Sequence, residues 1–408
     1  MSLRRSEINN KTKSTRKLEA WIVKKMAIQA SFYKKTKGVI ILAQGKSTKN
    51  LIVGIIALAV IVAVGIGAYK GRNTAHAPAD TSPSAVTADK GKNNDKSGES
   101  TDEGLLEVRT WTRKDCSLAP WLVTDKLGYF KEEGIKLVFT GEIQPNQGIP
   151  SILNGNNDVS SAHPNNLAVA VAGGAKLRGV ARAGIEPDEK VDPKFRHMWW
   201  FVNPEKYPNV KSLTDLKNIK GKLKFSTITT NICSDFLAYT LADKYRLPRE
   251  KIEWVTMPDI QAIQAVKQGL VDVAGVHPPF YKGMQDAGQV KIADSTETGL
   301  GASAGVGYYY FTDDYIKKNP DAVKRFVRAI KRGQKWANAN PDQAAKWTEE
   351  AIGVPVTGNH YYAENSTIIE SEIDPWLIEL EKSGVIPKGK LKPADLITHE
   401  FEKYGNQE

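Results

Sequence analysis

The distribution of apolar residues divides the chain into regions of different character. Residues 51–69 (LIVGIIALAVIVAVGIGAY) carry no charge, whereas residues 71–104 contain no Phe, Trp or Tyr. From residue 105 onward, short apolar runs alternate with amphipathic segments. This alternation predicts strands and helices that follow one another in an α/β domain with a mostly parallel sheet.

The apolar run 51–69 predicts a transmembrane helix, because its nineteen residues would span roughly 28 Å as a helix, close to the thickness of the hydrocarbon core. Thirteen Lys and Arg residues precede the run. The positive-inside rule therefore places the basic leader 1–50 in the cytoplasm and the rest of the chain outside. We expect an uncleaved, single-pass anchor in the cell membrane; a cleaved signal peptide, and translation from Met26 instead of Met1, stay open as alternatives.

Residues 70–104 are predicted to be a disordered tether, since they have too few apolar side chains to order themselves. The basic charge also belongs to this N-terminal part. Residues 1–100 hold 18 Lys and Arg against 6 Asp and Glu, whereas the remainder holds 39 against 40. The near neutrality of the remainder excludes nucleic acid as its expected partner.

The folded part contains an internal repeat at an offset of 114 residues. Its shared pattern is Q-x-I-x-x-[IV]-x-x-G-x-x-D-V-x-x-x-H-P, from Gln147 to Pro164 and again from Gln261 to Pro278. The pattern predicts a short helix closed by Gly, then a buried strand that begins at Asp-Val. His163 and His277 would stand at the carboxyl ends of these strands, where α/β sheets bind ligands. Two similar lobes that share a cleft are therefore expected.

A second candidate site is the loop Thr229-Thr230-Asn231, which follows a predicted strand and precedes a helix. Free backbone N–H groups at a helix start can bind an anion. Ordinary capping by Asn231 or Ser234 is the competing interpretation. The two cysteines, Cys116 and Cys233, form no C-x-x-C motif, which argues against a zinc ribbon or a thioredoxin site. Whether they pair or stay free is left open.

Five short motifs occur in one order along most of the predicted folded region. They are LGYFKEEGI at 127–135, L-x-G-x-x-D-V at 153–159, S-L-x-D-L-K with G-K at 212–222, G-x-V-D…P at 269–278, and the N-P…A-N-x-N-P-x-x-A-A segment at 319–345. In this order they resemble the substrate-binding proteins of ABC transporters for nitrate, alkanesulfonates, taurine and thiamine-precursor pyrimidines. One departure is His277, at a position where such proteins often carry Glu.

The resemblance implies a type II periplasmic-binding fold, in which two doubly wound α/β lobes are joined by two hinge strands. Lobe 1 would comprise residues 105–202 and 304–408, and lobe 2 residues 203–303. We expect the chain to cross between them near 201–204 and 305–311. The anchor 51–69 would precede this fold as its one transmembrane helix.

In this fold the ligand lies between the lobes, against loops at the carboxyl ends of strands. The residues placed there by the resemblance and by the repeat are Asp115, Cys116, Trp121, Gln147, Ser161, His163, Thr229, Thr230, Asn231, Cys233 and His277. We expect Arg113 and Lys114 beside the first of these loops. A metal bound by the His and Cys residues is conceivable, but the resemblance favours an organic or oxyanion solute, so we expect neither a metal nor a cofactor.

The expected function is therefore extracytoplasmic binding of a small, anionic organic solute, such as a sulfonate, taurine or nitrate, for the permease and ATPase subunits of an ABC importer. A pyrimidine or other aromatic heterocycle is the alternative solute, and a membrane-anchored ligand sensor is the alternative function. An esterase is disfavoured: Ser303 lies in a G-x-S-x-G match, but a polar run precedes it where a nucleophile elbow needs a strand. We expect no enzyme.

Overall fold

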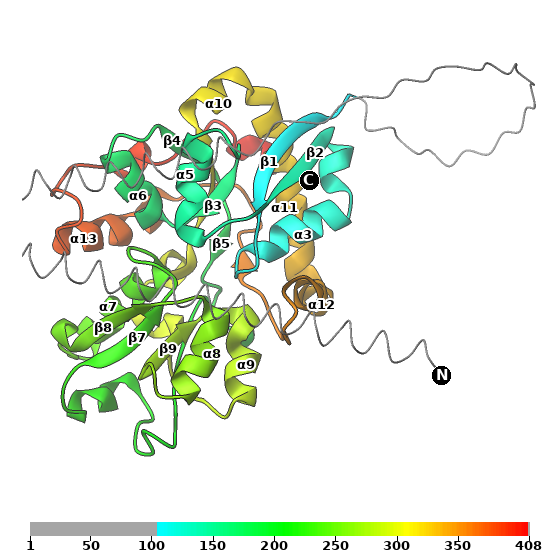
Figure 1. Cartoon of the computed structure of the whole chain (residues 1–408). Coiled ribbons are helices and arrows are strands. Elements are labelled where there is room, and N and C mark those ends of the chain that lie inside the picture. The colour runs from blue at the N-terminus through cyan, green and yellow to red at the C-terminus, as the bar shows by residue number, and fades with distance from the viewer. Residues whose placement is uncertain (1–103, 407–408) are drawn as a thin grey trace, which may run out of the picture. The chain divides into compact units, whose positions relative to one another are not determined.

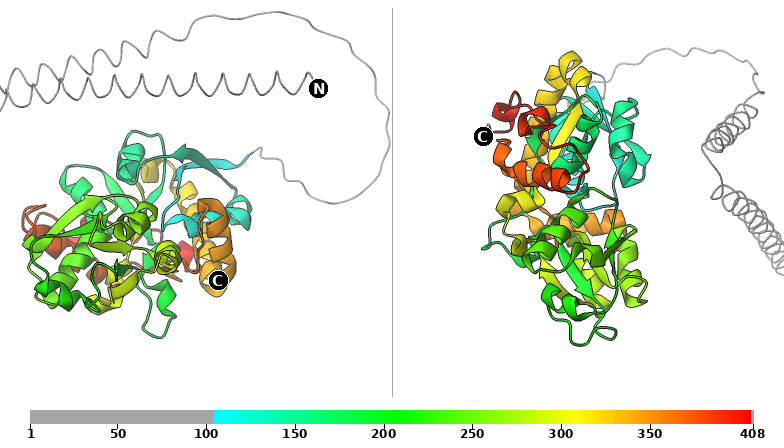
Figure 2. Two further views of the ribbon diagram at one scale, coloured as in Figure 1. Left: turned by 60° about the horizontal axis from the view of Figure 1, so that its bottom comes forward. Right: turned by 90° about the vertical axis from the view of Figure 1, so that its left-hand side faces the viewer.

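This computed structural model describes residues 104–406, which form two α/β lobes that lie one above the other in Figure 1. The upper lobe is made of two segments of the chain, and the segment between them, about a third of the described residues, forms the lower lobe. The upper lobe contains the first strands together with the C-terminal helices, and the lower lobe contains the middle of the chain (Figures 1 and 2).

Lobe 1 is built on two small sheets covered by helices. In one sheet β1 and β2 are parallel, with Leu106 opposite Ile135. In the other, β11 lies between β3 and β4 and is antiparallel to both. The elements are β1 Leu106–Thr112, α3 Leu118–Lys126, α4 Tyr129–Glu132, β2 Ile135–Glu142, α5 Gly148–Leu153, β3 Ser160–Ala162, α6 Pro164–Ala172, β4 Leu177–Arg182, β11 Tyr308–Thr312, α10 Asp313–Lys318, α11 Pro320–Ala339, α12 Pro341–Ile352, α13 Asp374–Lys382 and α14 Glu402–Gly405.

Lobe 2 is built on one five-stranded sheet of order β10-β6-β9-β7-β8. Strand β7 is parallel to β8 and β9, whereas β6 is antiparallel to β9 and β10. The elements are β6 Trp199–Val202, β7 Leu223–Thr227, α7 Cys233–Lys244, β8 Ile252–Thr256, α8 Asp259–Lys267, β9 Val273–Val276, α9 Tyr281–Asp286 and β10 Val290–Asp294.

The first crossing between the lobes differs from its predicted position, whereas the second overlaps the predicted range 305–311. Strand β6 lies in the sheet of lobe 2, so the first crossing precedes Trp199 and does not lie near 201–204. The chain returns between β10 and β11, through the 3-10 helices Ser295–Thr298 and Gly301–Gly305. A two-stranded sheet of β5 Gly184–Ile185 and β12 Tyr361–Tyr362 lies at the first crossing. The boundary was misplaced because the apolar WWFV run fits a strand of either lobe.

Helix α13 joins the lobes on one side. It packs on α6 of lobe 1, and its Trp376 ring stacks on Phe236 of α7, with ring centroids 4.1 Å apart. Glu379 of α13 accepts two hydrogen bonds from Arg249 of lobe 2, at 2.6 and 2.9 Å. Lys382 pairs with Asp243 beside them. Helix α13 therefore contacts both lobes on this side of the molecule.

Among residues 104–406, no helix combines the length and apolar character that crossing a membrane requires. The leader 1–50, the predicted transmembrane helix 51–69 and the predicted tether (70–104, apart from Gly104) lie outside the described residues.

The internal repeat forms the predicted structure in both lobes. Gly155 and Gly269, which follow α5 and α8, have φ values of +76° and +71°, where glycine has no steric cost. His163 and His277 are the N-caps of the elements after β3 and β9. The role of the repeated Asp was not predicted. Its carboxylate accepts the backbone N–H of Arg109 for Asp158 and of Lys224 for Asp272, at 2.9 and 2.8 Å.

The two aspartates should therefore stabilise both lobes in the same way. Asp158→Ala and Asp272→Ala each leave a strand N–H without its acceptor and remove an ion pair whose carboxylate is about a tenth exposed. We expect each to lower the free energy of unfolding by about 1–3 kcal/mol, measured by urea denaturation.

The control is Asp286→Ala, which removes an exposed pair with Lys282 and should change the free energy of unfolding by less than about 0.5 kcal/mol. If Asp158→Ala and Asp272→Ala both unfolded at the same urea concentration as the wild type, a structural role of the repeated Asp would be refuted.

Candidate functional site

A cavity of about 340 Å³ lies between the lobes and is lined by residues of both. Nine of the eleven predicted site residues line it: Asp115, Cys116, Ser161, His163, Thr229, Thr230, Asn231, Cys233 and His277. Loops at the carboxyl ends of β1, β3, β7 and β9 carry most of these residues. These residues thus lie together at the strand ends where α/β sheets bind ligands.

Two predicted site residues do not line this cavity. Trp121 is fully buried in the core of lobe 1, where its ring contacts Tyr309 and Phe326 at 5.3 and 5.5 Å. Gln147 is exposed at the end of the 3-10 helix Pro145–Gln147, although its neighbours Asn146 and Gly148 reach the cavity. Trp121 is a core residue and not a ligand contact, because helix α3 turns this side chain towards α11.

A chain of hydrogen-bonded groups links the two strand ends of lobe 2 that face the cleft. Nδ1 of His277 lies 2.6 Å from Oδ2 of Asp259, and Nε2 lies 3.2 Å from Sγ of Cys233. Burial by itself lowers the pKa of His277, but Asp259 and Cys233 outweigh it and raise this pKa well above its usual value. Burial by itself raises the pKa of the Cys233 thiol, but His163 and His277 lower it to about 6.

His163 faces the cleft from lobe 1. Its Nδ1 lies 2.7 Å from the backbone oxygen of Val306. Because a carbonyl oxygen only accepts, Nδ1 carries the hydrogen, and Nε2 of the neutral ring offers a lone pair. The ring stacks on Trp376, with centroids 5.2 Å apart and planes 11° from parallel. His163 is therefore held in one orientation by the fold.

The structure adds two histidines that the sequence reasoning missed. The ring of His197 lies 4.9 Å from that of His163 and 4.4 Å from that of His360. Both rings are buried, and burial lowers the pKa of each well below its usual value. Neither nitrogen of His197 has a hydrogen-bond partner, nor does Nε2 of His360. Such orphaned buried groups are rare and point to a ligand.

Four of the six histidines of the chain and both of its cysteines thus meet in one cleft. Cys116 and Cys233 are free thiols in this structure. Burial raises the pKa of the Cys116 thiol well above its usual value. No sequence motif places His197 or His360 near the repeat. The only signal in the sequence was the small number of His and Cys residues available to form such a cluster.

The expected anion site at the start of α7 is already occupied by a side chain. The carboxylate of Asp235 accepts the backbone N–H groups of Asn231 and Ile232, at 2.6 and 2.8 Å. Among the described residues, no Lys or Arg lines the cavity. Arg113 is buried against Trp121, and Lys114 pairs with Glu142 at the surface. The start of α7, Arg113 and Lys114 therefore no longer support the predicted anionic ligand.

The G-x-S-x-G match is not a nucleophile elbow. Gly301–Gly305 is a 3-10 helix that leads into strand β11, and Ser303 is buried within it. Its backbone oxygen accepts a hydrogen bond from Nε1 of Trp376 at 3.0 Å. This segment belongs to the second crossing between the lobes.

Comparison with known proteins gives a family and a fold. The model of the family described as NMT1/THI5 like matches residues 116–344, more than half of the chain. A Brucella abortus (strain 2308) protein, named only as a candidate binding protein, is 22% identical over 178 residues. The match covers 43% of this chain and 53% of that protein, so it spans about half of the relative's length.

Two solved structures have the same fold at low identity. The periplasmic nitrate-binding protein of Synechocystis PCC 6803 gives a TM-score of 0.60 at 13% identity, covering 74% of this chain and 88% of that one. The periplasmic aliphatic sulphonate-binding protein of Escherichia coli gives 0.55 at 16% identity, covering 72% and 92%. The predicted periplasmic-binding fold of the two lobes is thereby confirmed. The predicted mostly parallel sheet is not, because most strand pairs of the described residues are antiparallel.

The two thiols should differ in reactivity in the folded protein. In a Cys116→Ser variant, alkylation of Cys233 by iodoacetamide should accelerate with a midpoint near pH 6, because the thiolate is the nucleophile and the pKa of Cys233 is about 6. In a Cys233→Ser variant, Cys116 should react only at alkaline pH. Mass spectrometry of timed samples measures both rates.

The second expectation concerns the partner of Cys233. Replacement of His277 by Gln removes a cation beside the thiolate, so the alkylation midpoint of Cys233 should move upwards. An alkylation midpoint of Cys233 that stays unchanged in the His277→Gln variant would contradict this role of His277.

Proposed function

The chain belongs to the NMT1/THI5-like family, and from that membership we propose that it is an extracytoplasmic solute-binding protein that delivers a small molecule to an ABC importer. The observation that carries the proposal is the cavity between the lobes, whose walls come from both lobes and from the crossings. Such a cavity holds a solute when the lobes close about their hinge. The permease and ATPase subunits of an importer would be its partners.

The solute that this cavity favours is a small aromatic heterocycle. Its aromatic lining residues are Trp111, Tyr309, Tyr310 and Tyr362, together with His163, His277 and His360. Flat rings stack well on such walls, and ring nitrogens can bond to imidazole. A sulfonate or nitrate would need donors of positive charge, but the described lining holds no Lys or Arg, and its His277 is already paired with Asp259. The anionic solute is therefore the second candidate.

We further propose that residues 51–69 hold the binding domain at the outer face of the cell membrane through the segment 70–104. The support is the uncharged apolar run and the excess of Lys and Arg before it. The anchor would keep the cleft near the importer without a separate lipid group.

The solute can be identified on the protein as purified. Mass spectrometry of the small molecules released by denaturing the full chain should find an unsaturated ring compound. Added back, this compound should reduce the radius of gyration in small-angle scattering, because the lobes close on it. His163→Ala should weaken binding by at least about tenfold, equivalent to 1.4 kcal/mol.

His399→Ala is the control, since His399 lies at the surface between Glu370 and Glu402. Release of an aliphatic sulfonate or of nitrate would reject the heterocycle in favour of the second candidate. The cleft would be rejected as the binding site if a saturating solute left the radius of gyration unchanged and bound the His163→Ala variant as tightly as the wild type.

The orientation has its own test. Protease added to intact cells should release a fragment that begins between residues 71 and 104, because an exposed linker of this composition is readily cut. Cleavage that occurs only after the membrane is permeabilised would place the domain on the cytoplasmic side.

A further inference from the structure

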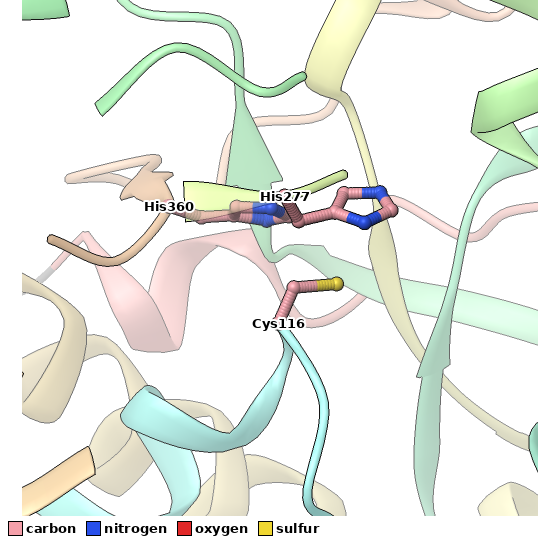
Figure 3. A group of neighbouring side chains, drawn as sticks. All are labelled: Cys116, His277 and His360. Carbon is pink, nitrogen blue, oxygen red and sulfur yellow. The ribbon is translucent and has the colours of Figure 1, made fainter. Parts of the chain in front are cut away.

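We propose that the cleft binds one transition-metal ion of the zinc class through Cys116, His277 and His360, with Cys233 as the fourth ligand. Figure 3 shows the first three side chains, with Cys116 on one side of the two imidazole rings. Their candidate ligand atoms lie within 4.8 Å of one another. The inference rests on the proposed function only in taking this cleft as the place where the lobes close.

The spacing fits a site that tightens when the ion enters. Tetrahedral zinc with bonds of about 2.1–2.3 Å separates its ligand atoms by about 3.4–3.8 Å. The three ligand atoms are thus up to about 1 Å too far apart. The pair Cys233 Sγ and His277 Nε2, at 3.2 Å, already has nearly the separation of two ligands of one ion. A small movement of one lobe towards the other would complete the set.

The origin of the ligands explains how such a movement would arise. Cys116 precedes α3 in lobe 1, His277 follows β9 in lobe 2, and His360 immediately precedes β12 at the crossing. One ion would therefore connect both lobes and the hinge. Metal binding and lobe closure would be the same event.

The surroundings of the imidazoles are those of metal ligands. A histidine that binds a metal usually donates its other ring N–H to a carboxylate or a backbone carbonyl. Nδ1 of His277 lies 2.6 Å from Asp259, which leaves Nε2 directed at Cys233. Nε2 of His360 is buried without a partner. An orphaned imidazole nitrogen and an oriented one at the same place are together evidence for a missing ligand.

The neighbouring residues His163 and His197 form a second group with Cys233, also within 4.8 Å. Since Cys233 belongs to this group and contacts His277 of the first, the two groups adjoin. We assign one ion to them, because two cations so close in a buried cleft would repel each other strongly. His163 and His197 then form the wall next to the ion.

The ligand types select the metal. Thiolate and imidazole prefer zinc and copper(I), whereas Mg²⁺ and Ca²⁺ prefer oxygen ligands. The carboxylate nearest in sequence, Asp115, is engaged by the hydroxyl and N–H of Ser117 at 2.7 and 2.9 Å. The ion could enter free or within a small organic chelate, and both sources share this chemistry.

The test uses the full chain, stripped of metal by a chelator. Calorimetric titration with Zn²⁺ should give one tight site per chain, and Mg²⁺ should give none. Co²⁺ as a spectroscopic probe should produce thiolate-to-metal charge-transfer absorption and the d–d bands of a tetrahedral ion. Repeating the titration with Zn²⁺ in complex with picolinate decides between the free ion and a chelate: ternary binding identifies the chelate as the source, and loss of picolinate identifies the ion.

Matched variants locate the site. Cys116→Ser and His360→Gln should each weaken Zn²⁺ binding by at least about tenfold, and Asp259→Asn, a positioning residue, should also weaken it by about tenfold or more. His399→Gln should leave the tight site unchanged, since it affects only a surface group. Thermal unfolding of each metal-free variant verifies that it folds.

A wild-type measurement makes the test independent of folding defects. Zn²⁺ should protect both Cys116 and Cys233 from alkylation, and Mg²⁺ should protect neither. Unchanged Zn²⁺ affinity in a Cys116→Ser/Cys233→Ser double variant, or an absent charge-transfer band, would overturn the inference. An organic solute that binds the metal-free protein at full affinity would leave the proposed transport function intact while the metal assignment fails.

Discussion

The side-chain nitrogen of Lys331 holds together the region where the chain crosses between the lobes. This nitrogen is buried and donates hydrogen bonds to the backbone oxygens of Arg182, 3.1 Å away at the end of β4, and of Ala363, 2.5 Å away after β12. Gln334, one turn later on α11, donates to Ala183 at 2.9 Å. Helix α11 of lobe 1 thus fixes both strands of the small hinge sheet. The placement of His360 beside β12 depends on this support.

The His and Cys side chains of the cleft come from segments that are far apart along the folded chain. His163 and His277 come from the two copies of the repeat, whereas His197 and His360 come from the segments that flank β6 and β12. A cluster of four imidazoles and two thiols is costly to bury without partners. The fold satisfies His277 through Asp259 and His163 through Val306. The remaining nitrogens stay open to a ligand, which is what a receptor requires.

The two-lobed fold could be predicted from the sequence, and nine of the eleven predicted site residues line the cavity, because both follow from local patterns. The repeat places His163 and His277 at strand ends whatever the details of packing, and Asp-Val marks the strand start in both lobes. The misplaced boundary at β6, the buried Trp121 and the capping carboxylate of Asp235 could not be predicted, because each depends on which distant segment packs against it. His197 and His360 belong to the same category: tertiary structure alone brings them to the cleft.

The contacts of α13 have a consequence for the kinetics of exchange. Trp376 is enclosed between His163 of lobe 1 and Phe236 of lobe 2, and the Arg249–Glu379 pair lies nearby. An aromatic pair contributes about 0.5–1.5 kcal/mol beyond its burial, and an ion pair at the surface about 1 kcal/mol at most. In the proposed function, opening of the lobes to release a solute would require these contacts to separate together. The residence time of the solute would then depend on a helix that does not line the cavity, and weaker α13 contacts would speed release.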